Sequence, residues 1–554
     1  MLPCVIFEDE LLLVINKPAG MNTHAPSPFA GEGIYDWLRH REPRWARLAI
    51  IHRLDKETSG VLVFGKSTPA NRSLTEQFAS RSVRKKYLLL SDHAPKKTGL
   101  LVKSKIARAG ERYVSTASGE MAETRFGPVA CSSRREEAQI FFNLPRASRP
   151  ISVVEAEPLT GRTHQIRVHA AENGFPILGD TLYGGAPFQR VCLHAAEITL
   201  KHPATAEEMT FRAPVDFARD ARADLRTALI DTDQTNAYRL IHGASDGWPG
   251  WYVERLGDFL LSQSKTPLTK PQQERLAQLG PGVRGVYHKI LSRHVRGASA
   301  AEASPQLISG EAAPERFTVR ENGLQFELSF NEGYSVGLFL DQRDNRRRFL
   351  TSHIAAEFSL RLTEHGTRLA APKRSGGGNT PLEVLNAFSY TCSFSVCAAK
   401  SGARTTSLDL SKKYLEWGRR NFALNGLDPA RHDFIYGDAF DWMRRLAKKG
   451  RTFDVIVLDP PTFSQSKERG IFRVEKNYGE LVLAALPLLK KEGVLLASTN
   501  AADWPPEIFL AVVEKSIRAV KRKILQQHYV PQPPDFPISR AEPAYLKTVW
   551  MRVA

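Results

Sequence analysis

The sequence has few cysteines and no segment that would anchor it in a membrane. Its five cysteines stand far apart and show no metal-type spacing with histidine, and disulfides are not expected in a chain of this size. No run of about 18 apolar residues appears, so no transmembrane helix is predicted. The first residues lack the basic and apolar segments of a secretory signal. These absences favour the cytoplasm. The cysteines are Cys4, Cys131, Cys192, Cys392 and Cys397.

The charge is strongly unbalanced towards positive. The chain has 77 Lys and Arg against 59 Asp and Glu, a formal net charge of +18. A chain this basic usually meets a polyanion. A membrane surface is the rival, but no basic amphipathic helix or lipidation signal is present, so nucleic acid is the favoured partner. The 554 residues exceed what one core holds, and roughly two to four domains are expected.

Residues 52–60 are the most informative stretch. They lie between the apolar runs 48–51 and 61–64, which favours a loop or strand edge that crosses a sheet. The stretch places Arg53 and Asp55 before a Thr-Ser-Gly turn. A carboxylate beside cations and donors stays ionised and can act as a nucleophile or base. The alternative is a capped turn with a surface ion pair, which would be the better interpretation of a lone aspartate.

The rest of the first 220 residues alternates short apolar runs with turn residues. This pattern predicts a mainly antiparallel sheet with a few helices. Residues 16–20 have the turn chemistry that closes the first strand. The predicted strands contain residues 11–15, 61–64, 87–90, 140–142, 153–155 and 198–200.

Two polar clusters stand out in this region. Residues 84–87 combine three cations with Tyr87, so they can hold phosphates while the ring stacks on a base. A solvated basic strand end is an equal alternative. Residues 159–169 form the second cluster. Its His164 and His169 could be read as metal ligands, but no carboxylate or cysteine joins them, so no metal is predicted.

Together these stretches resemble the catalytic domain of the RluA-type pseudouridine synthases, whose motifs occur here in order and end with residues 179–185. The resemblance implies that Asp55 is the catalytic aspartate, that Tyr87 stacks on the target uracil and that Arg167 pairs with Asp55. The reaction needs no cofactor, and the uridine must leave its stack to be reached. RNA contacts are predicted at His52, Arg53, Arg84, Lys86, Arg162 and His164.

The middle of the chain is predicted to be a small α+β region. Residues 218–226 are charged and Ala-rich, as in a linker that ends in a helix. Two strands joined by a Gly/Pro turn fit residues 235–253. Residues 296–305 have no apolar period and are expected to form a mobile loop. Residues 317–330 fit a hairpin that turns at 321–323.

From about residue 336 strands alternate with helices. Strands are predicted at 383–388, 403–409, 454–459 and 493–498, and a helix follows Ser411. This alternation predicts a doubly wound parallel sheet, which binds ligands at the carboxyl ends of its strands. Acidic residues stand at those ends. No clean G-x-G-x-x-G occurs, so a nicotinamide dinucleotide is not favoured.

This region resembles the S-adenosylmethionine methyltransferases of the RlmI/RlmK type from about residue 235 to the end, most closely at 337–347, 385–403, 408–426 and 453–467. Cys392 stands where relatives have glycine, and residues 371–381 look like a disordered Gly-rich insertion. Neither an S4 nor a PUA RNA-binding domain is expected. The resemblance implies cofactor contacts at Phe339, Asp341, Arg343, Asn386, Phe388, Ser389, Cys392, Asp409, Asp438 and Asp459. Contacts with the target base are predicted at Pro460, Pro461, Phe463 and Asn500.

The sequence therefore predicts a bifunctional RNA-modifying enzyme whose partner is ribosomal RNA of the large subunit. We expect a pseudouridine synthase domain over 1–220, a small α+β RNA-binding domain over 221–335 and a Rossmann-like methyltransferase domain over 336–554. The alternatives are a non-catalytic, RNA-binding ribosome assembly factor and a protein with only one active domain.

The predicted methyl acceptor is guanine N7 rather than cytosine carbon 5. Enzymes that methylate carbon 5 first attack carbon 6 with a cysteine thiolate. No cysteine occurs after Cys397, and residues 498–500 resemble the corresponding motif of guanine-N7 relatives. Guanine N7 already has a free lone pair, so positioning alone could suffice.

Overall fold

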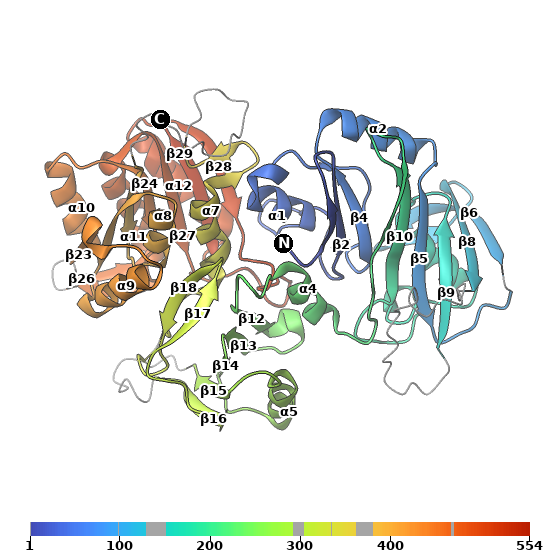
Figure 1. The fold of residues 1–554 in the computed structure, drawn as a ribbon, viewed down its shortest axis with the longest axis horizontal. Coiled ribbons are helices and arrows are strands. Elements are labelled where there is room, and N and C mark those ends of the chain that lie inside the picture. The colour runs from blue at the N-terminus through green and yellow to red at the C-terminus, as the bar shows by residue number, and fades with distance from the viewer. Residues whose placement is uncertain are drawn as a thin grey trace. The chain divides into compact units, whose positions relative to one another are not determined.

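A computed structural model describes residues 2–97, 99–128, 151–291, 304–333, 335–361, 381–466 and 470–554. The predicted strand at 140–142, Cys131 and most of the loops at 296–305 and 371–381 lie outside these residues. The chain divides into two compact units (Figure 1). The first unit is Met1–Pro26, Glu32–Leu38 and Arg47–Asp231, and the second is Ser27–Gly31, Arg39–Ala46 and Thr232–Ala554. The three domain boundaries proposed from the sequence stay a prediction.

The first unit is built on one sheet of 11 strands, in which all pairings are antiparallel except that of β10 with β4. The mainly antiparallel sheet is therefore confirmed. Three α-helices, together with α1, whose last residues belong to the second unit, complete the described part. The strands are β1 (Val5–Glu8), β2 (Leu12–Lys17), β3 (Ala49–Ile50), β4 (Ser59–Gly65), β5 (Arg84–Ser91), β6 (Leu100–Ala109), β7 (Arg112–Ser115), β8 (Glu120–Pro128), β9 (Ser152–Pro158), β10 (Leu193–Lys201) and β11 (Glu208–Arg212), and the helices are α1 (Ile34–Arg41), α2 (Thr68–Ala79), α3 (Gln165–Glu172) and α4 (Ala221–Leu229).

Helices α2 and α3 cover different parts of this sheet. The Ser67 hydroxyl accepts the Ala70 N–H at the start of α2, and Leu74 of that helix packs into an apolar cluster with Val14 and Val63. Ile166 of α3 belongs to another cluster, around β5, β9 and β10. The sheet thus supports the loop 52–60 from β4 and the polar cluster 159–169 from α3.

The second unit begins with a sheet of five strands in the order β12-β13-β14-β15-β16, followed by a hairpin of β17 and β18. The predicted hairpin and its turn at 321–323 are confirmed. A capping box of Thr269 and Gln272 starts the helix of this part. The elements are β12 (Ala237–His242), β13 (Trp251–Leu256), β14 (Phe259–Ser264), α5 (Lys270–Leu279), β15 (Gly285–Ile290), β16 (Gln306–Gly310), β17 (Phe317–Glu321) and β18 (Leu324–Leu328).

The remainder forms a sheet of seven strands in the order β23-β22-β21-β24-β27-β29-β28. The first five run parallel, as predicted, whereas β29 is antiparallel to both of its neighbours. The alternation of strands and helices could not show this reversal, because β28 and β29 have no helix between them. The elements are β21 (Glu383–Ala387), α8 (Ser393–Lys400), β22 (Arg404–Asp409), α9 (Lys412–Leu424), β23 (Asp433–Tyr436), α10 (Ala439–Lys448), β24 (Phe453–Leu458), α11 (Val474–Ala485), β27 (Leu489–Thr499), α12 (Pro506–Ala519), β28 (Ile524–Val530) and β29 (Lys547–Val553), with α7 (Arg343–Thr351), β19 (His353–Ala355), β20 (Phe358–Ser359), β25 (Phe463–Ser466) and β26 (Gly470–Arg473) beside them.

Both faces of this sheet are buried, as its continuous apolar strands require. Val455 and Val457 of β24 belong to a cluster with α7, α8 and α9, and Ile456 and Leu458 belong to another with α10, α11 and α12. The layers of Figure 1 follow from this alternation. Among the described residues, no helix is both long and apolar enough to cross a membrane.

Candidate active sites

A cavity of about 480 Å³ in the first unit gathers residues from the stretches that the sequence singled out. Asp55 lies on its wall with Tyr87 of β5 and with His164 and Arg167 at the start of α3. The predicted catalytic residues of the synthase region are thus brought together around one opening. A cavity of this volume accommodates a small polar ligand such as a nucleoside.

Two potentially cationic groups face the same oxygen of Asp55. Arg167 Nη1 lies 3.8 Å and His164 Nε2 3.9 Å from Asp55 Oδ2. Arg167 is itself held by two hydrogen bonds of 2.7 Å to the buried Asp180. Burial opposes the charge of Arg167, but its hydrogen bonds to Asp180 and the nearby charges of Asp180 and Asp55 raise its pKa. Arg167 therefore remains a guanidinium beside Asp55.

Strand alternation divides the basic cluster at the start of β5. Lys85 and Tyr87 line the cavity, whereas Arg84 pairs with Glu208 at 2.7 Å and Lys86 lies 4.0 Å from Glu155. Arg84 and Lys86 are exposed and are not among the described residues that line the cavity. Lys85 is the cation that shares a face with Tyr87, because side chains two residues apart point the same way. The sequence expectation had placed the substrate contacts on Arg84 and Lys86.

The other predicted RNA contacts of this unit all line the cavity, but they differ in how strongly their side chains are bonded to other residues of the protein. Arg53 is exposed, and Arg162 donates to the Met121 carbonyl at 3.1 Å and pairs with Glu120. His52 accepts the Val63 N–H at 3.0 Å and stacks on a phenylalanine ring. Burial, followed by the charge of Lys85, lowers the pKa of His52 to about 3. His52 is thus a neutral wall of the cavity rather than a phosphate contact.

A buried lysine that the sequence did not single out fixes the Asp55 loop. Lys17 Nζ donates to the carbonyls of Pro18 and Met21, at 2.8 and 2.7 Å, and to that of Lys56 at 3.2 Å. The side chain is fully buried, and this burial lowers its pKa to about 7 although the charges of Glu57 and Asp55 act the other way. Lys17 ties the turn after β2 to the residue that follows Asp55.

A directed series of hydrogen bonds supports the end of the same loop. Arg190 donates to the Ser59 hydroxyl at 2.6 Å, that hydroxyl lies 2.8 Å from His194 Nδ1, and His194 Nε2 lies 3.0 Å from the Ala213 carbonyl. An arginine can only donate and a carbonyl can only accept, so the proton positions between them are fixed. We call this series the Ser59 relay. It reaches no atom of Asp55.

In the second unit, Asp409 ends β22 in the position that the sequence predicted. Its carboxylate accepts the N–H groups of Tyr390 at 2.8 Å and Ser411 at 2.9 Å, and so it joins the turn after β21 to the start of α9. Phe388, Tyr390 and Cys392 in that turn have φ of 62°, 47° and 63°. Left-handed conformations at non-glycine residues are strained and cluster at ligand sites.

Cys392, expected from the sequence to replace a glycine of relatives, is a buried free cysteine. Its thiol is fully buried, and a Cβ added to Gly418 of α9 would lie 2.4 Å from Cys392 Sγ. Gly418 therefore makes the space that the cysteine fills. The backbone of the turn, rather than the thiol, is what Cys392 can offer to a cofactor.

Asp459, directly after β24, receives a second directed series of hydrogen bonds. Trp550 Nε1 donates to Asn345 at 3.0 Å, Asn345 Nδ2 donates to Gln342 at 2.7 Å, and Gln342 Nε2 donates to Asp459 Oδ2 at 3.1 Å. An indole N–H is only a donor, so the orientation of both amides follows from Trp550. We call this series the Asp459 relay. Burial, then the neighbouring charge of Asp341, raises the pKa of Asp459 to about 7.

Several predicted cofactor residues are engaged within the protein. Asp341 accepts the Tyr545 hydroxyl at 2.8 Å, and the buried Arg343 forms a two-pronged pair with Asp535 at 3.0 and 2.5 Å. Asp438 accepts two N–H groups as the N-cap of α10. Asn386 donates to the Ser395 hydroxyl at 2.9 Å, and Ser389 is buried. Phe339 is 45% exposed, beside the ring of Tyr390.

The predicted base contacts follow the tips of β24 and β27. Pro460 is buried and Pro461 is exposed, and the half-buried Phe463 begins β25. Asn500 is exposed directly after β27. The structure thus places all four at the carboxyl ends of neighbouring parallel strands.

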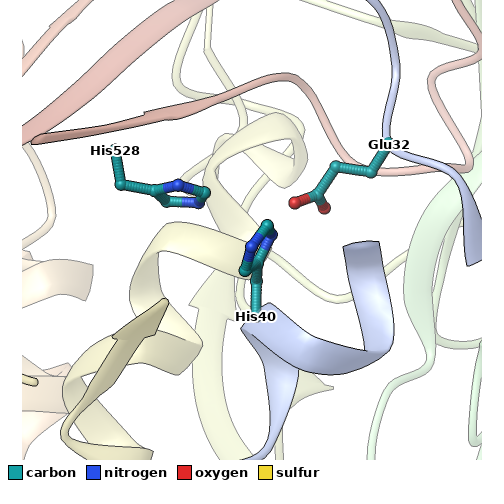
Figure 2. Close-up of side chains that lie close together, drawn as sticks. All are labelled: Glu32, His40 and His528. Carbon is teal, nitrogen blue, oxygen red and sulfur yellow. The ribbon is translucent and has the colours of Figure 1, made fainter. Parts of the chain in front are cut away.

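Figure 2 shows His40 and His528, two residues of the second unit whose ring centroids lie 4.3 Å apart. Glu32, drawn with them, belongs to the first unit. We assign no metal site to these three residues.

The topology and the acidic strand tips make the seven-stranded part of the second unit Rossmann-like, with a ligand site expected at the carboxyl ends of its parallel strands. The family described as S-adenosylmethionine-dependent methyltransferase matches residues 239–552, more than half of the chain, and the family described as RNA pseudouridylate synthase matches residues 11–172. The chain therefore belongs to the S-adenosylmethionine-dependent methyltransferases and carries an RNA pseudouridylate synthase domain before that part. Both resemblances read from the sequence are confirmed.

Individual relatives agree with this division. The chain is 32% identical over 361 residues to a ribosomal RNA large subunit methyltransferase of Deinococcus radiodurans, which covers 63% of this chain and 81% of the relative. It is 30% identical over 413 residues to ribosomal RNA large subunit methyltransferase I of Aeromonas salmonicida, which covers 73% and 94%. It is 40% identical over 228 residues to ribosomal large subunit pseudouridine synthase C of Yersinia pestis, and the match spans 38% of this chain and 66% of that relative.

Proposed function

We propose that this chain carries out two RNA modifications, isomerising uridine to pseudouridine in its first unit and methylating a base in its second. The cavity that joins Asp55, Tyr87 and Arg167 is the observation that carries the first activity. Isomerisation breaks the bond from C1′ to N1, turns the base, and forms a bond from C1′ to carbon 5, whose proton moves to N1. Asp55 supplies the carboxylate near C1′ or C2′, Arg167 holds it, and Tyr87 stacks on the uracil.

The substrate is ribosomal RNA of the large subunit, on which the named relatives act. A net charge of +18 suits such a polyanion, and the cytoplasm is where it would be met. Of the cations that line the cavity, Lys85, Arg53 and Arg162 contact the phosphates around the target uridine in this proposal. The experiment is a mass map of ribosomal RNA from a strain that lacks this gene. Pseudouridine and a base methyl group should be missing from the RNA, and an unchanged map would contradict the proposal.

In the second unit, S-adenosylmethionine supplies the methyl group, and the residues of this chain hold and orient it. The donor set fits: Asp409 offers a carboxylate at the tip of β22, and the strained turn 388–392 lies beside it. We propose that the predicted cofactor residues form this site, except Arg343 and Asp438, which stabilise the fold around it. Asp409→Ala should greatly reduce the thermal stabilisation by S-adenosylmethionine. An unchanged shift would place the ribose contact elsewhere.

We further propose that methyl transfer uses no cysteine nucleophile, which favours guanine N7 over carbon 5 of cytosine. In the second unit, Cys392 and Cys397 are fully buried. Burial raises the pKa of Cys392 to about 12 and that of Cys397 as well, whereas a nucleophile must be a thiolate. Asn500 and the Pro460–Phe463 region then serve to position the base.

Two measurements test this part. A variant with all five cysteines changed to Ser should still methylate, and fluorocytidine-containing RNA should form no covalent adduct. Fragmentation of the modified nucleoside should locate the methyl group on guanine. Methylated cytosine without an adduct would contradict guanine N7 alone, whereas a trapped adduct would contradict the absence of a cysteine nucleophile.

A further inference from the structure

Tyr183, at the end of the short 3₁₀ helix Thr181–Tyr183, contacts both groups that face Asp55. The Arg167 guanidinium lies over its ring, 5.0 Å from the centroid. Its hydroxyl lies 2.8 Å from His164 Nδ1. Arg167 and His164 are the two residues whose nitrogens approach Asp55 Oδ2, so one side chain touches both of its neighbours.

The ring of Tyr183 is fixed by the core of the first unit. It packs against the buried cluster of Ile106, Ala122 and Val168. The glycine after it, Gly184, has a φ of 81°, and a Cβ added to Gly185 would lie 1.9 Å from the Ile177 carbonyl oxygen. The Tyr-Gly-Gly sequence is therefore required for the tight turn that presents this ring.

The hydrogen bonds of the Tyr183 hydroxyl have a direction. The hydroxyl accepts the backbone N–H of Tyr113 at 2.8 Å. Among the described residues, His164 Nδ1 is then the one partner that can accept a hydrogen bond from the Tyr183 hydroxyl. A ring nitrogen that accepts leaves the proton on the other nitrogen. His164 Nε2 consequently carries its hydrogen on the side of Asp55.

We infer that Tyr183 is a positioning residue that sets the tautomer of His164 and the place of Arg167, so that an N–H group of each faces Asp55 Oδ2 at ion-pair distance. This inference rests on the proposed pseudouridine synthase function. The ion-pair contacts of Arg167 and His164 with Asp55 are at Oδ2, at 3.8 and 3.9 Å, and no hydrogen bond reaches Asp55 Oδ1 in the part of the chain that the structure describes. The two oxygens of Asp55 thus have different roles: Oδ2 is held from the protein side, and Oδ1 is the oxygen offered to the ribose of the target uridine.

The first test needs no variant and no RNA. Nitrogen NMR of the full-length protein labelled in its histidine rings should show neutral His164 with Nδ1 unprotonated and Nε2 protonated, the signal being assigned with His164→Gln. A protonated Nδ1 in the neutral ring would overturn the inference. This result does not depend on whether the protein modifies RNA.

Two matched variants give the second test, because each removes the hydroxyl of a tyrosine whose ring packs beside His164. Tyr183→Phe keeps the ring under Arg167 and should shift the His164 Nδ1 signal. Tyr113→Phe keeps the backbone N–H that Tyr183 accepts and should leave that signal unchanged, although its ring centroid lies 5.3 Å from that of His164. No shift in a folded Tyr183→Phe protein, or equal shifts in both variants, would overturn the inference.

The third test measures turnover on an unmodified transcript of large-subunit ribosomal RNA. Tyr183→Phe should lower kcat on the order of 10- to 100-fold with little change in KM, because it misplaces groups at the reacting carboxylate rather than those that bind RNA. A change confined to KM would assign Tyr183 to substrate binding instead. A wild-type protein that forms no pseudouridine would contradict the proposed function, and the NMR tests would still decide the role of Tyr183.

Discussion

Asp55 and Asp459 are held in opposite ways. Asp55 lies on the wall of a cavity, and an arginine and a histidine approach one of its oxygens. Asp459 accepts a neutral amide N–H, and burial together with the nearby Asp341 raises its pKa to about 7. A carboxylate beside cations suits a reaction at the sugar, whereas one held by a neutral donor suits a hydrogen bond to the cofactor. The difference shows that the same residue type is prepared for two chemistries by its neighbours.

The two relays sharpen this comparison. The Ser59 relay ends on the Ala213 carbonyl and steadies the Asp55 loop without touching its carboxylate. The Asp459 relay ends on the carboxylate itself. A change within the Asp459 relay should therefore lower methyl transfer directly. A change at one site should not affect the activity of the other.

The largest expected effect comes from the aspartates themselves. Asp55→Asn should lower pseudouridine formation by at least about 10³-fold, as removal of a catalytic group does, and leave methylation intact. Asp459→Asn should do the reverse. Both products can be counted by mass spectrometry in one reaction. Loss of both activities in either folded variant would break the comparison.

A smaller effect is expected from the Asp459 relay. Gln342→Met keeps the side-chain length but removes the N–H that Asp459 accepts, so methyl transfer should fall about 10- to 100-fold. Calorimetry should show nearly unchanged binding of S-adenosylmethionine. Gln342→Glu is the matched second variant and should also lower methyl transfer. Its side-chain oxygen can still accept from Asn345, but a carboxylate cannot donate to Asp459. Normal methyl transfer in both variants would remove the relay from the mechanism.

Whether a contact could be predicted from the sequence depends on how close its residues are along the chain. The strand tips with Asp409 and Asp459 followed from apolar runs and loop chemistry, and Ser411 indeed begins α9. The relays could not be read in this way, because Ser59 and His194 are 135 residues apart and Gln342 and Asp459 are 117 apart. The position of Lys85 could have been predicted from the sequence, since its two-residue spacing from Tyr87 puts both on one face of β5. Tyr183 stood inside a recognised motif, but its contacts with His164 and Arg167 arise only when β7, α3 and the turn after it meet.

The pH dependence of stability tests the raised pKa of Asp459 in the second unit. The folded-state pKa of Asp459 is about 7, against 3.8 for the unfolded group, so the folded state holds an extra proton between these values and loses stability as pH rises through them. Asp459→Asn removes this titration. Its calorimetric transition should lie above that of the wild type at pH 8 and coincide with it near pH 4. The transition that S-adenosylmethionine shifts identifies the second unit. A pH-independent difference would contradict the assignment.

The smallest effect concerns Lys17 in the first unit. Its folded-state pKa of about 7 lies below the ordinary 10.5, so the unfolded state binds more protons between these values and stability rises with pH there. The free energy of unfolding of Lys17→Met should not rise in this way. The amount by which it falls below the wild-type value should therefore grow from pH 7 to pH 9, by at most about 1.4 kcal/mol per pH unit. Hydrogen exchange of β2 and β4 measures it. Lys96→Met, which removes an exposed lysine, is the control, and equal slopes in both variants would contradict the account.

The central claim is that one chain holds two active sites built and used independently. The most direct measurement incubates an unmodified transcript of large-subunit ribosomal RNA with the purified full-length protein, with and without S-adenosylmethionine, and counts both modifications by mass spectrometry. The account predicts the same yield of pseudouridine in both reactions and methylation only when S-adenosylmethionine is present. Pseudouridine formation that requires S-adenosylmethionine, or the absence of either product with it present, would contradict the account.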